Sequence, residues 1–134
     1  MPQVAQLFFK TAVVFLIVGI AMGLHMSMSG NHDTIGAHAH TNLLGWVTSA
    51  LFGGYYALNP AKAETRLAQI HFWVYTLGVA AMVPALYIFL KGYPAMEPLV
   101  ALTSLVIFAG VIVFAMVVFR APARQQAGAT PGLG

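Results

Sequence analysis

Four apolar stretches, each long enough to cross a bilayer, make up most of this 134-residue chain. A helix rises about 1.5 Å per residue, so about 20 apolar residues span the ~30 Å hydrocarbon core. The stretches cover residues 7–28, 35–58, 67–90 and 95–119, and the intervening SGNHDT, NPAKAET and KGYP have turn chemistry. The sequence therefore predicts an all-α membrane protein, with a four-helix transmembrane domain at 1–120 and a disordered cytoplasmic tail at 121–134.

Composition supports this class and excludes others. Charged residues make up 7% of the chain, whereas a soluble domain carries about 25%. The absence of cysteine excludes disulfides and thiolate metal sites. The net charge is only +3 and the basic residues are scattered along the chain, which argues against a nucleic-acid partner. An alternative for the N-terminus is a cleaved secretory signal, with Lys10 before the apolar run, which would leave three spans.

The basic residues predict an orientation. If four helices alternate across the membrane, five basic residues fall on one side and only Lys91 on the other; the five are Lys10, Lys62, Arg66, Arg120 and Arg124. The positive-inside rule then predicts that both termini face the cytoplasm. The chain would be a multi-pass protein of a bacterial-type inner membrane. His25, His32, His38 and His40 would lie toward the outer side, and His71 in the inner half.

The second stretch carries the most unusual residues, in GAHAHTNLLGWV. His38 and His40 are costly against lipid, and the glycines of this stretch allow another backbone or a flat ligand to approach closely. Residues two apart on a helix point about 200° away from each other, so the two imidazoles should face different spaces. We therefore expect this helix to be buried within an assembly.

Two interpretations of the H-x-H pair follow from the residues alone. The histidines could hydrogen-bond to neighbouring helices or line a water-filled inlet. They could instead ligate a metal or a haem iron, since neutral imidazole is the commonest metal ligand and a usual axial ligand of haem. Gly45 and Trp46 would then help to form the haem slot.

The order H-x-H, G-W and, from His71, H-F-W resembles helices of the catalytic subunit of haem–copper oxidases, over roughly residues 36–93. The likeness is closest to the branch that contains nitric oxide reductases. It implies a b-type haem protein that transfers electrons or that binds or reduces O2 or NO as an oxidoreductase. By this resemblance His38 matches the active-site-haem ligand and His40 the low-spin-haem ligand. The chain has no adjacent His-His pair to complete the family's copper site.

The resemblance also implies an oligomer. The family's catalytic subunit has about twelve helices in three arcs of four, and this chain would supply one arc. Closed homo-oligomers reuse one interface around an axis. A homotrimer would thus rebuild the twelve-helix architecture, with His38 of one protomer and His40 of the next facing a shared haem.

Two further histidines, in addition to His38 and His40, are candidate metal ligands. His71 could be a ligand, a hydrogen-bonding or proton-relay group, or an interfacial histidine beside Trp73 and Tyr75 in the aromatic belt. His25 lies in HMSMSGNHD, whose thioethers and imidazoles suit copper. Two other functions therefore stay open: a haem-free copper-binding or metal-transport protein, and a cofactor-free accessory subunit of a respiratory complex. No motif identifies a redox partner.

Overall fold

The structure is a computed structural model that describes residues 1–121, and within that range the chain is helical without strands. Almost all of the expected disordered tail, including Arg124, lies outside the described residues. The elements in chain order are α1 (Gln3–Ser29), α2 (Ile35–His40), the π-helix η1 (Thr41–Thr48), α3 (Ser49–Leu58), α4 (Pro60–Ala63), α5 (Arg66–Leu90), the 3-10 turn η2 (Pro94–Met96) and α6 (Glu97–Phe119).

Three helical stretches of the described chain are long and apolar enough to cross a membrane. They are Gln3–Ser29, Arg66–Leu90 and Pro94–Phe119, and they agree with the first, third and fourth predicted spans. The predicted span 35–58 is helical throughout, but it consists of α2, η1 and α3 in succession, none of which reaches span length alone. The protein is thus an all-helical, multi-pass membrane protein with three candidate spans.

Local chemistry explains where the helices begin and end. Gly30 has φ 70°, a left-handed conformation that glycine adopts without steric cost, and it terminates α1. Pro60 occupies the first turn of α4, where its missing N–H would have no helical partner anyway. Thr65 caps α5, because its hydroxyl accepts a hydrogen bond from the Ala68 amide at 3.2 Å.

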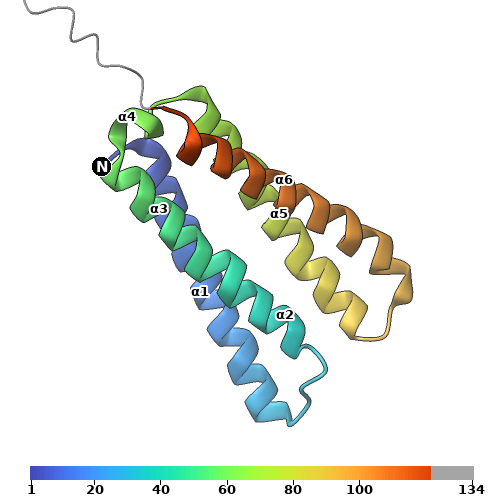
Figure 1. Cartoon of the computed structure of the whole chain (residues 1–134). Coiled ribbons are helices and arrows are strands. Elements are labelled where there is room, and N and C mark those ends of the chain that lie inside the picture. The colour runs from blue at the N-terminus through green and yellow to red at the C-terminus, as the bar shows by residue number, and fades with distance from the viewer. Residues whose placement is uncertain (122–134) are drawn as a thin grey trace, which may run out of the picture.

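The helices form two pairs that lie side by side (Figure 1). Helix α1 runs along η1 and α3, and α5 runs along α6. The N-terminus, α4 and the C-terminal end of α6 lie at one end of the bundle, which we call the α4 end. There the Lys62 ammonium donates to the Val118 carbonyl at 3.0 Å and links α4 to α6.

Small residues bring α5 and α6 into close contact. A Cβ on Gly110 of α6 would lie 3.0 Å from the Tyr75 Cα, and one on Gly78 of α5 would lie 3.0 Å from Ile107. Close packing of this kind is a main source of helix association in lipid, where burial of apolar surface provides little driving force. Among the three candidate spans, α5 is the most enclosed by its neighbours.

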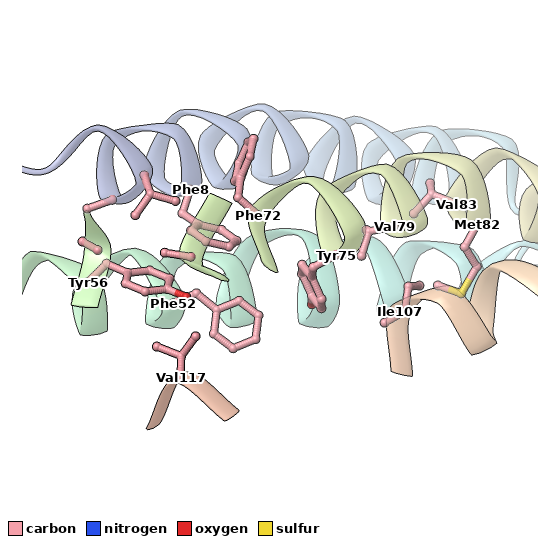
Figure 2. Close-up of a cluster of buried hydrophobic side chains, with 14 residues drawn as sticks. Phe8, Phe52, Tyr56, Phe72, Tyr75, Val79, Met82, Val83, Ile107 and Val117 are labelled. Carbon is pink, nitrogen blue, oxygen red and sulfur yellow. The ribbon is translucent and has the colours of Figure 1, made fainter. Parts of the chain in front are cut away.

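Aromatic side chains of α1, α3 and α5 form a buried core (Figure 2), and Phe114 of α6 packs against it. Phe8 of α1 meets Phe52 and Tyr56 of α3, with ring centroids 5.5 and 5.8 Å apart. Phe72 of α5 lies edge-on to Phe8 at 5.0 Å. Phe114 of α6 closes the cluster 4.4 Å from Phe52. This cluster holds the two helix pairs together.

Candidate functional site: the histidines and the π-helix

A π-helix, Thr41–Thr48, follows His40 directly. Such segments are rare and often occur at functional sites. Hydroxyl groups bond the carbonyls of this segment: Thr48 Oγ1 donates to Leu43 O at 2.7 Å, and Tyr75 Oη of α5 donates to Leu44 O at 2.7 Å. Tyr75 therefore anchors the π-helix to the most enclosed span.

His38 faces α1. Its Nδ1 is 2.7 Å from the Gly19 carbonyl, and its Nε2 is 3.4 Å from Asn42 Nδ2. A carbonyl can only accept, so Nδ1 carries the proton and Nε2 accepts from the Asn42 amide. A Cβ on Gly23 would lie 2.9 Å from the imidazole Cε1, so His38 needs the glycine face of α1. Both of its ring nitrogens are engaged within the chain.

His40 has different surroundings. Its side chain is exposed, and its Nδ1 is 2.7 Å from the Gly36 carbonyl one turn earlier. The same donor argument places the proton on Nδ1 and the lone pair on Nε2, for which the described residues supply no partner. A histidine whose Nδ1–H donates to a carbonyl is typical of metal ligation through Nε2. The two histidines thus face different spaces, as their 200° separation predicts.

Gly45 and Trp46 lie in η1, but the space beside Gly45 is filled by the chain itself. Gly45 is buried, and an added Cβ would lie 2.5 Å from Phe15 Cγ of α1. Trp46 is half-buried. The close approach that this glycine allows is therefore that of an α1 side chain. Any role of Gly45 and Trp46 in a haem slot stays a prediction.

His71 is fully buried inside the aromatic core. Its Nδ1 shares a hydrogen bond of 2.9 Å with the Tyr56 hydroxyl, and its Nε2 has no hydrogen-bond partner. The rings of Phe52 and Phe114 lie 4.5 and 5.0 Å from the imidazole. The aromatic-belt interpretation of His71 is therefore wrong, because a side chain without exposed surface cannot lie at the lipid interface; Trp73 is the exposed member of the motif, at 52%.

Sequence reasoning missed the partner of His71. Tyr56 belongs to α3, and only the packing of α3 against α5 brings its hydroxyl to the imidazole. The sequence did indicate that His71 would have a partner, because a polar side chain that is buried in an apolar span requires a hydrogen bond. Pattern alone could not choose Tyr56 over the adjacent Tyr55, whose hydroxyl instead accepts from Lys62 at 3.0 Å.

The remaining histidines do not assemble into a metal cluster. His25 is exposed on α1 beside a small cavity that Tyr87 also lines, and His32 Nδ1 contacts the Gly30 carbonyl at 3.3 Å. Within residues 1–121, no group of three or more histidine, cysteine or acidic side chains could hold a metal ion. A copper site at the α1–α2 turn and metal binding by His71 remain predictions from sequence.

Comparison with known proteins supports one relationship. A curated relative, described as "Cytochrome c oxidase subunit 1 homolog, bacteroid" from Bradyrhizobium diazoefficiens, is 38% identical over 68 residues. The match covers 46% of this chain and 12% of the relative. No protein-family model and no solved structure matches the chain. The match supports a relationship to haem–copper oxidase subunit I over part of the chain.

Proposed function

We propose that this chain binds b-type haem in the membrane, with His40 as an axial ligand, and serves electron transfer or the binding or reduction of O2 or NO. The observation that carries the proposal is the state of His40. Its side chain is exposed, its Nδ1 is held by Gly36, and its Nε2 lone pair is available. An exposed imidazole within an apolar bundle is costly unless a ligand or another chain covers it.

His38 is the proposed second ligand, supplied by a neighbouring protomer. Its Nδ1 bond to Gly19 fixes the ring and leaves Nε2 as the ligating atom. The Asn42 amide contact to this nitrogen is long, at 3.4 Å, so ligation requires Asn42 to turn away. His38 would therefore bind haem at the expense of a contact within the chain, whereas His40 loses none.

We also propose that the chain forms a homotrimer that rebuilds the twelve-helix architecture of the haem–copper oxidase subunit. In this assembly α2, η1 and α3 together form a fourth membrane span. One face of that segment is exposed and apolar below His40; it comprises Leu43, Val47, Leu51 and Leu58. Gly54 has open space beside it and lets another helix approach. A neighbouring copy on this face would cover His40. In the proposed topology both termini lie on the cytoplasmic side of a bacterial-type inner membrane.

When bound, haem would supply a one-electron iron centre: held by both His38 and His40 it would serve electron transfer, and it would bind a diatomic gas only where one of the two histidines is released. The residues of this chain would hold and orient it. Gly36 sets the tautomer and ring direction of His40, and Tyr75 fixes the π-helix that follows.

The test is an absorption spectrum of the purified protein. Wild type should show a Soret band and sharp reduced α and β bands. His40→Ala should lower the haem content at least about tenfold, a loss of about 1.4 kcal/mol or more. Added imidazole should restore part of the Soret band, because it replaces the missing ligand. His25→Ala is the matched control, because it removes a different exposed imidazole, one that lies on α1. This variant should retain haem.

His38→Ala and native mass spectrometry complete the experiment. His38→Ala should also lose haem and, unlike His40→Ala, should lower the stability of the α1–α2 packing. Native mass spectrometry in mild detergent should give a trimer with haem. A haem-free wild-type protein refutes the cofactor, and a monomer with full haem refutes the shared site.

A further inference from the structure

An apolar groove of about 600 Å³ lies between α1 and α5. Its walls include Val14 and Val18 on α1 and Ala80, Pro84 and Tyr87 on α5. At the α4 end it continues into a smaller cavity that shares Val14 and Ala80 and reaches Thr76 and Lys10. At the other end it continues into a cavity that shares Val18 and Tyr87 and reaches His25. The three form one channel along the two helices.

The sequence explains why this channel stays open. The small residues of α1, Gly19 and Gly23, face Asn42 and His38, so they draw α1 toward the α2–η1 segment. The side of α1 that faces α5 carries larger side chains, those of Val14, Phe15, Val18 and Met22, and no glycine that would allow the same close approach. Opposite them α5 presents the short side chains of Ala80 and Pro84, which cannot fill the space.

The channel is at least as long as one leaflet is thick. On α5 its lining runs from Thr76 to Tyr87, 11 residues or about 16 Å, and on α1 from Lys10 to His25, 15 residues or about 22 Å. Half of the hydrocarbon core is about 15 Å thick. The channel can therefore hold one extended lipid chain from the membrane surface to the midplane or beyond it.

The surface end of the channel carries the group that would select a headgroup. Lys91 is the C-cap residue of α5, and its ammonium lies 5.7 Å from the centre of the Tyr87 ring, which lines the channel. His25 lies beside Tyr87 at the same end. A cation beside an interfacial tyrosine favours a phosphate or another anionic lipid group.

We propose that the channel between α1 and α5 holds one acyl chain of an anionic phospholipid, with the lipid phosphate beside Lys91. The apolar walls accept the chain and Lys91 selects the charge. The proposal is independent of haem binding, because none of the channel residues named here takes part in the proposed haem ligation.

The experiment uses the full chain, stripped of lipid in mild detergent and titrated with dioleoyl phosphatidylglycerol or dioleoyl phosphatidylcholine. Native mass spectrometry counts the lipids bound to each protomer. Wild type should hold one phosphatidylglycerol, with about fivefold lower affinity for phosphatidylcholine, as expected for one basic residue near a lipid surface. Lys91→Gln should abolish that preference. Lys10→Gln, at the opposite end of the channel, should retain it, and Arg66→Gln, exposed and outside the channel lining, is the control.

A second pair of variants tests the chain-binding walls. Ala80→Phe fills the channel and should lower lipid affinity about tenfold or more. Ala101→Phe places the same ring on the exposed face of α6 and should leave affinity unchanged. If circular dichroism shows that Ala80→Phe is unfolded, Val18→Phe on the opposite wall, 40% exposed in wild type, takes its place.

Three outcomes overturn the proposal. The first is equal lipid affinity in the Ala80→Phe and Ala101→Phe proteins. The second is an unchanged headgroup preference in Lys91→Gln. The third is a change in the number of subunits with Ala80→Phe while the lipid count stays constant, which would make the channel a contact between copies of the chain.

Discussion

The hydrogen bond between Tyr56 and His71 gives a sharp test of the core. Both side chains are fully buried, and their 2.9 Å contact is the only hydrogen bond of the His71 ring within the described residues. Tyr56→Phe leaves both imidazole nitrogens without a partner. His71→Leu leaves the Tyr56 hydroxyl without one. Each single change should therefore destabilise the protein, and the double variant, which removes both polar groups, should not.

The expected magnitude follows from the cost of a buried unpaired group. Leaving such a group costs about 1–3 kcal/mol in proteins, and interhelical hydrogen bonds in membranes average near the lower end of that range. We therefore expect about 1–2 kcal/mol for Tyr56→Phe and a smaller cost for His71→Leu, because His71→Leu also removes the unpaired Nε2. The double variant should lie within about 1 kcal/mol of wild type, since replacing both partners by apolar groups of similar size is nearly neutral.

The assay is reversible unfolding in mixed detergent micelles, followed by far-ultraviolet circular dichroism, in a double-mutant cycle. Tyr93→Phe, which removes a tyrosine hydroxyl from an exposed turn, is the control and should not change stability. The interaction energy of the cycle should be about 1 kcal/mol or more in favour of the double variant. Additive single effects would refute the reasoning, because they would show that the two groups do not depend on each other.

Two further predictions concern packing and topology. Gly110→Ala should cost about 1–3 kcal/mol by the same unfolding assay, because its Cβ would lie 3.0 Å from backbone Tyr75 Cα, whereas Ala101→Leu, on the exposed face of α6, should not destabilise the protein. Equal effects of the two would contradict the close packing of α5 and α6. Reporter fusions after residue 32 and after residue 134 should report opposite sides of the membrane if the α2–α3 segment is a span; the same side would mean that it is not.

The class of the protein follows from the sequence alone. Apolar runs of about 20 residues can satisfy their backbone in lipid only as helices or closed barrels, and the runs here are too continuous for alternating strands. Proline and glycine at positions 60 and 30 mark helix boundaries for local steric reasons. These properties depend on neighbouring residues, so the sequence predicted the three candidate spans to within a few residues.

The opposite orientation of the two histidines is also a local property. It depends only on the rotation per residue of a helix, and the structure shows His38 against α1 and His40 exposed. What each histidine contacts could not be predicted. The Gly19 carbonyl that binds His38 lies 19 residues away in the chain, and only helix packing brings it there.

Tertiary structure decided the remaining features. It buried His71 with Tyr56, filled the space beside Gly45 with Phe15, and left a channel between α1 and α5. It also made Thr41–Thr48 a π-helix, in which Tyr75 of a different helix bonds the Leu44 carbonyl. Each of these depends on which helix faces reach one another. In lipid, close fit and hydrogen bonds choose those faces, and hydropathy, which sequence displays most plainly, does not distinguish them.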